Sequence, residues 1–317
     1  MPAIPANSRI KPPALQRGDT IGIVAPASNI KRELLEAGCE RLRQLGYEPF
    51  YFDSIFEQDL YFAGSVERRA RELEEMFVRD EVRAIICARG GYGSNYLLEA
   101  LDIKKIAAHP KIFTGYSDIT TLLTYFADAA GLVTFHAPMV TKDFANPDGM
   151  DMASWEAALS GRSGWTIHTG ADSGVKPLAD GSGEGILYGG CLSMLVASLG
   201  TPYEIRSAGT ILFIEDVAAK PFQIDRMLMQ LKLAGKLADA RGLIFGEMLD
   251  CIQHPNQSYT LEEVIKRIVV ELGVPVAYGL RSGHVSRQNV TLPIGVRAAL
   301  EVKNGNVSLN ILEAATS

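Results

Sequence analysis

The sequence has no long hydrophobic run, few cysteines and no excess of positive charge. No apolar run approaches the roughly 18 residues that a membrane-spanning helix needs, so we expect no such helix. The four cysteines are widely spaced and form no CxxC pair, which argues against a disulfide framework and against a zinc site. The formal net charge of −6 argues against a protein that binds nucleic acid or anionic membranes through their phosphates.

The N-terminal segment up to Asp19 also lacks the apolar core and the cleavage site of a secretory signal. Hydrophobic residues make up 47% of the chain and charged residues 21%, a globular composition that argues against disorder, collagen and coiled coil. At about 150 residues per domain, the 317 residues predict about two domains. We therefore expect a globular, cytoplasmic protein.

The first half of the chain alternates short apolar strands with helices. We expect strands at residues 20–25, 82–87 and 111–114, and helices at 31–45, 66–79 and 94–101. Such alternation is typical of βαβ units with a mainly parallel sheet. Near the C-terminus, Asn304-Gly305 separates two strand-like runs and predicts a β-hairpin.

The middle of the chain differs in amino-acid composition from both halves. Residues 161–190 contain nine glycines, interspersed with Ser, Asp and Lys, which is typical of a connection between domains. We predict an N-terminal domain at 1–145, a linker at 146–185 and a C-terminal domain at 186–317. The predicted fold class is α/β, with an N-terminal parallel-sheet α/β domain and a C-terminal mixed, β-rich α/β domain.

The most informative local pattern is Gly115-Tyr-Ser-Asp118, which follows an apolar strand and precedes a helix. A tight turn of this kind lifts the Ser117 hydroxyl out of the sheet and leaves the Asp118 N–H free to bind an oxyanion. Only half of the GxSxG motif of hydrolases is present, so an ordinary serine helix cap remains an alternative. Arg89-Gly-Gly-Tyr-Gly93 ends a neighbouring strand. It is either a simple turn or the source of a second oxyanion donor, the Gly91 N–H.

A serine nucleophile requires a base, and the chain offers five histidines. His284 lies on a polar loop between two strand-like runs, the kind of loop that often carries catalytic residues. His136 lies near a turn, which is more typical of a structural histidine. We expect the other three at the surface: His109, His168 and His254. Sequence context therefore favours His284 as the base.

The base requires an orienting acid, and residues 210–216 form an apolar strand that ends in two carboxylates. Alternation along the strand puts Glu215 and Asp216 on opposite faces, so only one of them can face a given partner. A carboxylate at the end of a buried strand is costly to bury unless it is hydrogen-bonded, which predicts a specific partner. A salt bridge is an alternative role for this acid, and Glu247 is a competing candidate.

Six segments, in chain order, resemble the LD-carboxypeptidase family, the serine peptidases that include the microcin C immunity peptidase. They are 15–19 (LQRGD), 89–93 (RGGYG), 115–120 (GYSDIT), 189–193 (GGCLS) with 199–202 (LGTP), 211–216 (ILFIED) with 225–228 (DRML), and 283–284 (GH). Two positions depart from the family pattern. Val217-Ala-Ala-Lys220 stands where members often have Gly-Glu, and Cys191 stands where they often have Asn.

The resemblance implies a Ser117 nucleophile in the N-terminal domain, with Glu215 as acid and His284 as base in the C-terminal domain. It also implies that the N–H groups of Gly91 and Asp118 bind the oxyanion. The implied enzyme is a serine LD-carboxypeptidase that removes the terminal D-alanine from murein tetrapeptides in cell-wall recycling, with no cofactor and no metal. The family is often dimeric, so we expect a homodimer.

A murein tetrapeptide ends in a carboxylate, so the substrate pocket is expected to contain a basic group. Arg89 and Arg287 are our candidates for that group, and Tyr92 is a further candidate for substrate binding. Because the protein is acidic overall, its positive charge must be local to the site.

Two other functions fit parts of the sequence. An immunity-type peptidase would cleave an amide that joins a peptide or amino acid to a nucleotide-like group, and an aromatic residue would stack on the purine. The only tryptophans, Trp155 and Trp165, lie near the linker. A two-domain periplasmic-type binding protein would require a signal peptide, and it gives no reason for a serine, a glutamate and a histidine to meet.

Overall fold

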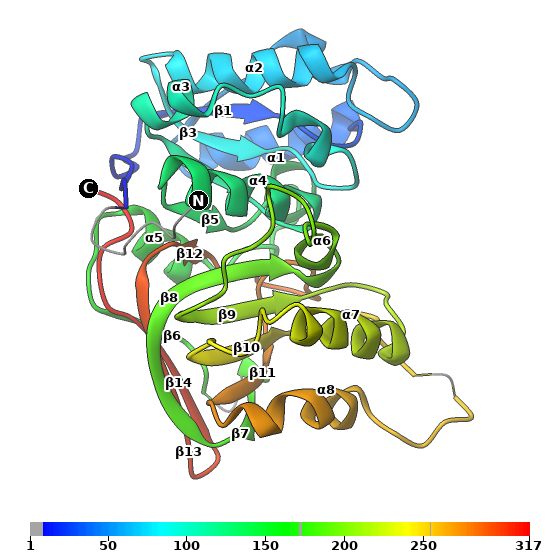
Figure 1. Cartoon of the computed structure of the whole chain (residues 1–317). Helices are drawn as coiled ribbons and strands as arrows, with labels where there is room; N and C mark the ends of the chain where they lie inside the picture. The colour runs from blue at the N-terminus through cyan, green and yellow to red at the C-terminus, as the bar shows by residue number, and fades with distance from the viewer. Residues whose placement is uncertain (1–8, 171–172, 254) are drawn as a thin grey trace.

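The computed structural model describes residues 9–170, 173–253 and 255–317, and within these ranges the strands form two sheets (Figure 1). The first sheet has six strands. In spatial order they are β12 (Leu292–Ile294), β5 (Thr134–His136), β4 (Ile112–Gly115), β3 (Val82–Cys87), β1 (Thr20–Val24) and β2 (Glu48–Phe50). All neighbours pair in parallel except β12, which is antiparallel to β5. The predicted parallel sheet is therefore confirmed.

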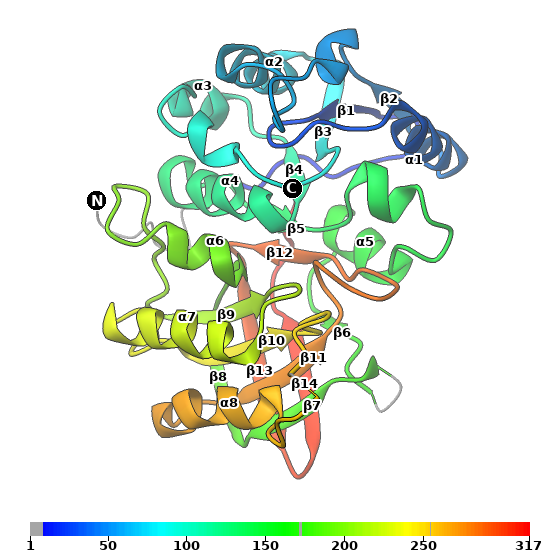
Figure 2. The same cartoon turned by 90° about the vertical axis from the view of Figure 1, so that its right-hand side faces the viewer.

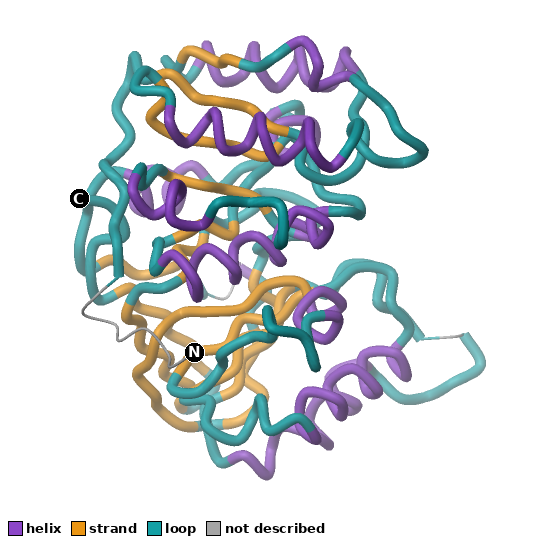
Figure 3. Tube along the Cα trace, turned by 45° about the horizontal axis from the view of Figure 1, so that its top comes forward, coloured by secondary structure: helices purple, strands orange, loops and turns teal. Residues whose placement is uncertain are grey.

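Helices cover both faces of this sheet (Figures 2 and 3). Residues on one face of β1 and β3 pack with α1 (Arg32–Gln44), and those on the other face pack with α2 (Val66–Val78), α3 (Ile103–Ala108) and α4 (Thr120–Tyr125). The strands are apolar on both faces for this reason. Cys39 and Cys87 are both buried in this core.

One expected helix is much shorter than predicted. The segment expected to be helical over 94–101 contains only the 3-10 turn η3 (Ser94–Leu97). The Ser94 N–H and hydroxyl donate to the side chain and carbonyl of Asp118, which ties the start of this turn to a neighbouring strand end. Asp102 then caps a separate helix, α3.

The second sheet has eight strands and mixes parallel with antiparallel pairs. In spatial order they are β6 (Trp165–Ile167), β14 (Asn306–Ile311), β13 (Arg297–Lys303), β8 (Gly181–Cys191), β9 (Thr210–Glu215), β10 (Gly242–Gly246), β11 (Val276–Leu280) and β7 (Lys176–Ala179). One face packs against α6 (Leu192–Ala197), α7 (Pro221–Leu233) and α8 (Leu261–Val269). Together with the parallel first sheet, this mixed sheet confirms the predicted fold class.

The C-terminal hairpin is also confirmed, because β13 and β14 pair from Lys303 and Asn306 outward. Asn304 and Gly305 form the turn with φ of 51° and 80°, the left-handed values that a two-residue hairpin turn requires. None of the helices in the described ranges is long and apolar enough to cross a membrane.

The Gly-rich middle of the chain has more regular structure than a linker. Residues 146–185 contain α5 (Met152–Leu159), β6, β7 and the first residues of β8. Several glycines allow close backbone packing here, since a Cβ on Gly183 would lie 1.9 Å from the Arg241 carbonyl oxygen. The domain boundaries drawn from the sequence stay a prediction.

Strand β12 joins the two halves of the molecule. It follows the strands of the second sheet in sequence but pairs with β5 of the first sheet, with Leu292 opposite His136. Figure 1 shows it beside β5, below the N-terminal strands. The chain between the end of β11 and the start of β12 therefore runs from one sheet to the other, and this is the loop that contains His284.

Gly38 is a test of how closely α1 packs on the first sheet. A Cβ at this position would lie 2.3 Å from the carbonyl oxygen of Val140, which belongs to the helical turn η6 (Val140–Phe144). Alanine is the better helix former by about 1 kcal/mol. A backbone oxygen cannot move aside cheaply, however, so we expect Gly38→Ala to lower the free energy of unfolding by about 1–3 kcal/mol.

The urea midpoint of unfolding measures this difference. Glu36→Ala, at an exposed position of the same helix, is the matched control and should change stability by less than about 0.5 kcal/mol. A higher midpoint for Gly38→Ala would show that the helix can shift to accept a side chain.

Candidate active site

Ser117 lies on a strained turn at the end of β4. Its φ of 64° is in the left-handed region, which is costly for a residue with a side chain. The turn is tight, because a Cβ on Gly115 would lie 2.7 Å from the Ile119 side chain. Gly90 packs directly on the serine, and a Cβ there would lie 3.0 Å from the Ser117 Oγ. The absence of a side chain at position 90 thus lets residues 89–93, which we call the glycine loop, approach the serine.

The glycine loop presents a free backbone donor next to Ser117. Gly91 has a φ of 110°, and its N–H donates no hydrogen bond to any residue that the structure describes. The next N–H, that of Tyr92, donates to Ser28 Oγ at 3.1 Å. Burial raises the pKa of the Asp118 carboxyl, and its Oδ2 accepts the Ser94 N–H at 2.8 Å. These contacts fix the loop relative to the serine turn, as an oxyanion site requires.

Glu215 and His284 are in direct contact. The Glu215 side chain ends β9 and is completely buried, and its Oε2 accepts the His284 N–H at 3.0 Å and the Nδ1–H at 2.8 Å. Burial alone raises the pKa of this carboxyl, but the neighbouring histidines outweigh burial and hold the pKa at about 2. Since a carboxylate only accepts, Nδ1 carries the ring proton and Nε2 is left to accept one.

Tyr116 connects the serine turn to the histidine loop. Its ring packs edge-on against the His284 ring, with the ring centres 5.2 Å apart. The residue before Ser117 therefore touches His284, although the two residues come from different sheets. The exposed Lys142 places its Nζ 5.6 Å from the centre of the same ring. Lys142 is a cation near the site that the sequence patterns did not single out.

The sequence analysis missed the position of His136. This histidine ends β5, opposite Gly115 of β4, and is completely buried. Its Nδ1 lies 3.0 Å from Ser282 Oγ, and its Nε2 lies 3.8 Å from Glu215 Oε1. The only sequence signal was a histidine at the end of an apolar run, which does not reveal a partner in the other sheet.

The remaining candidates lie around these residues. Arg89 is exposed at the start of the glycine loop, and its Nη1 donates to the Asn29 carbonyl at 3.2 Å. Arg287 is exposed on the His284 loop. The competing acid Glu247 accepts the Ser286 N–H at 3.0 Å, so it holds the backbone of this loop and not the His284 ring.

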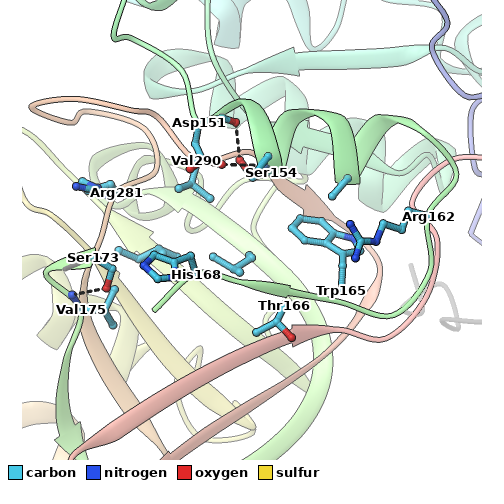
Figure 4. A pocket seen from close by; sticks show the side chains of 14 residues that line it. Asp151, Ser154, Arg162, Trp165, Thr166, His168, Ser173, Val175, Arg281 and Val290 are labelled. Carbon is cyan, nitrogen blue, oxygen red and sulfur yellow. Dashed lines mark hydrogen bonds between the residues drawn. The ribbon is translucent and has the colours of Figure 1, made fainter. Parts of the chain in front are cut away.

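Two cavities lie beside these elements. One of about 440 Å³ is lined by Tyr92, Asp118 and Met194, among others. The Tyr92 side chain is 41% exposed and packs against the rings of Phe62 and Tyr96. An aromatic surface thus lies next to the glycine loop. A smaller cavity of about 150 Å³ lies between α5 and the start of the His284 loop (Figure 4).

Residues from the predicted linker hold the far end of the His284 loop. The Asp151 N–H donates to the Asn289 carbonyl, and the Thr291 N–H donates to Ser154 Oγ, each at 3.0 Å. Figure 4 shows Ser154 and Asp151 at the start of α5, across the smaller cavity from Arg281. The histidine loop is therefore held by hydrogen bonds to three separate parts of the chain: Glu215 of β9, Glu247 after β10, and the start of α5.

Of the other three histidines, the structure describes His109 and His168. His109 and His168 are exposed, as expected, and His254 lies outside the described residues. Within the described ranges, no group of three His, Cys, Asp or Glu side chains is arranged to hold a metal ion. The chemistry of the cluster is thus that of a hydroxyl, an imidazole and a carboxylate, with backbone donors beside them.

A two-sheet α/β fold with these groups defines a serine peptidase class, and comparisons with known proteins identify the family. The LD-carboxypeptidase N-terminal domain model matches residues 21–137, and the LD-carboxypeptidase C-terminal domain model matches residues 184–300. The chain belongs to the LD-carboxypeptidase family, and it is a serine carboxypeptidase. The resemblance drawn from the six sequence segments is confirmed.

Individual relatives match over almost the whole chain. A probable murein peptide carboxypeptidase of Bacillus subtilis is 40% identical, covering 92% of this chain and 91% of the relative. The solved muramoyltetrapeptide carboxypeptidase of Oxalobacter formigenes is 31% identical, with a TM-score of 0.80 over 93% of this chain and 99% of that one. The microcin C7 self-immunity protein MccF is 25% identical, with a TM-score of 0.89 over 97% and 100%.

The backbone of Ser117 allows a test of strain that is separate from activity. Ser117→Ala and Ser117→Gly both remove the hydroxyl, but only glycine adopts a φ of 64° without steric cost. We expect Ser117→Gly to be the more stable variant by about 1 kcal/mol, measured as a higher melting temperature.

Ser182 is the matched control, because it is exposed in β8 without a left-handed φ. There the order should reverse, with Ser182→Gly less stable than Ser182→Ala. If Ser117→Ala were more stable than Ser117→Gly, the turn would not be strained.

Proposed function

We propose that Ser117, Glu215 and His284 are the catalytic triad of an LD-carboxypeptidase that removes the terminal D-alanine from murein tetrapeptides. The observation that supports this most directly is the buried Glu215 carboxylate bound to His284 Nδ1 at 2.8 Å. It leaves Nε2 as a proton acceptor, and Tyr116, the residue before Ser117, touches the histidine ring. The names of the Bacillus and Oxalobacter relatives support the substrate class.

In the proposed reaction, His284 Nε2 takes the proton from the Ser117 hydroxyl as Oγ attacks the scissile carbonyl. The N–H groups of Gly91 and Asp118 bind the oxyanion of the tetrahedral intermediate. His284 then gives the proton to the amine of the departing D-alanine, and water hydrolyses the acyl-enzyme by the same route. Glu215 keeps the proton on Nδ1 and stabilises the imidazolium.

We further propose that Arg89 binds the C-terminal carboxylate of the peptide. It directly precedes Gly90, which packs on Ser117, so its side chain is attached to the loop that carries the proposed oxyanion donor. The second candidate, Arg287, lies on the His284 loop, three residues after the proposed base. Tyr92 would contact the substrate through the exposed face of its ring.

The immunity-type alternative has less support. Trp155 and Trp165 are 1% and 5% exposed in the core, so neither offers a free face for a purine. The homodimer implied by the family resemblance and the cytoplasmic location expected from the sequence stay predictions.

The triad is tested by incubating the enzyme with a murein tetrapeptide and identifying the products by mass spectrometry. We expect loss of one alanine, and we expect Ser117→Ala and His284→Ala each to slow it at least about 10³-fold, because triad residues act as a unit. Both variants should keep the melting temperature within a few degrees.

An aminoacyl nucleotide-like amide in a parallel reaction separates the two substrate classes. Hydrolysis of this amide without loss of alanine from the tetrapeptide would favour the immunity-type function. Unchanged tetrapeptide turnover by Ser117→Ala would refute the nucleophile.

The carboxylate site is tested by Arg89→Leu. A hydrogen bond to a charged group contributes about 1.5–3 kcal/mol, so KM for the tetrapeptide should rise roughly 10- to 100-fold with a smaller change in kcat. A tetrapeptide amide, which lacks the carboxylate, should be equally poor for both enzymes. Arg83→Leu, at an exposed arginine of β3, is the control and should leave KM unchanged.

A further inference from the structure

The second oxygen of the Glu215 carboxylate faces another histidine. Oε2 is occupied by His284, whereas Oε1 faces the His136 Nε2 at 3.8 Å. Both Oε1 and Nε2 are buried, and neither has a hydrogen-bond partner among the described residues. Two buried polar atoms that face each other without a hydrogen bond are costly unless they interact.

The hydrogen bonds of the Ser282 hydroxyl bear on which ring nitrogen of His136 carries a proton toward the Glu215 carboxylate. The Ser282 hydroxyl donates to the Val290 carbonyl at 2.8 Å, so its oxygen accepts the Nδ1–H of His136 at 3.0 Å. In that arrangement Nε2 carries a proton as well only if the ring is protonated on both nitrogens. If the hydroxyl turned toward Nδ1 instead, the single proton of a neutral ring would sit on Nε2. A bare Nε2 would set its lone pair against the carboxylate, so the favourable arrangements place an Nε2–H opposite Oε1.

The position of the His136 ring is fixed from several sides. Its backbone is in register with Gly115, two residues before Ser117, and with Leu292 of β12. The Phe213 ring packs against it with a centre-to-centre distance of 5.1 Å. Gly283 has no room for a side chain, because a Cβ there would lie 2.6 Å from Glu215 Cδ and 2.8 Å from His136 Cε1.

We propose that His136 is a positioning residue, whose Nε2–H faces the second oxygen of Glu215 across 3.8 Å and by this electrostatic attraction holds the carboxylate in place for His284. His136 acts through Glu215 and touches neither the substrate nor Ser117. It comes from the sheet that carries the serine, so it aligns the acid of one sheet with the nucleophile of the other. This inference rests on the proposed triad.

Two substitutions separate the two ring nitrogens. In His136→Asn the amide replaces Nδ1, so the contact with Ser282 is kept and the donor to Glu215 is lost. In His136→Gln the longer amide replaces Nε2, so the donor to Glu215 is kept and the contact with Ser282 is lost. We expect His136→Asn to lower kcat about 10- to 100-fold, the size of effect seen when a residue that orients a metal ligand is removed. KM should change little.

His136→Gln should recover most of this kcat. A histidine that only supports the fold through Ser282 predicts the reverse order, with His136→Asn the more active variant, and that order would overturn the proposal. Melting temperatures identify variants that do not fold. If His136→Asn does not fold, the test rests on His136→Gln. A folded His136→Gln with near-normal kcat supports the proposal, and a folded but inactive His136→Gln overturns it.

A double-mutant cycle with Glu215→Gln distinguishes this inference from the triad itself. If His136 acts through Glu215, adding His136→Asn to Glu215→Gln should cost less than about threefold in kcat. Two losses that multiply would overturn the positioning role. Full activity of Glu215→Gln alone would refute the triad, whereas an impaired Glu215→Gln beside a fully active His136→Asn would refute only the role of His136.

Discussion

The buried charge of Glu215 is the constraint on which the arrangement of the site depends. A carboxylate without water costs several kcal/mol unless its oxygens receive hydrogen bonds. The end of β9 cannot supply these donors, because its own backbone is committed to the sheet. The donors come instead from the loop after β11, through His284, with His136 at the end of β5 facing the other oxygen. The site is therefore complete only when both sheets are packed against each other.

The path of the histidine loop follows from this requirement. The loop leaves the second sheet at Leu280 and enters the first sheet as β12, so its middle lies where both sheets meet. Gly283 gives it the close approach to the carboxylate that a side chain would prevent. Hydrogen bonds from Asp151 and to Ser154 then fix its far end. An imidazole held in this way needs little reorganisation for the role of base that we propose for it.

Local patterns predicted the parallel sheet, the hairpin at Asn304-Gly305 and the burial of β9, because each depends on residues close in sequence. The alternation along β9 that separates Glu215 from Asp216 was likewise a local property. What the patterns could not show depends on pairing across the chain. His136 looked structural because its partners Ser282 and Glu215 lie far away in sequence, and β12 is only three residues long. The glycines near position 183 suggested a linker, although they permit close packing between strands.

The acidic character of the protein does not conflict with a carboxylate-bearing substrate. At physiological ionic strength the screening length is about 8 Å, so charges spread over the surface act weakly on a group inside the site. Lys142 lies within this range of Tyr116, with its Nζ 5.6 Å from the ring centre, and Arg89 lies on the glycine loop that packs on Ser117. The net charge of −6 then acts on solubility and on the exclusion of polyanions, while under the proposed function the cations near the site contribute to the affinity for the peptide. Local placement of charge, and not its sum, determines what such a site binds.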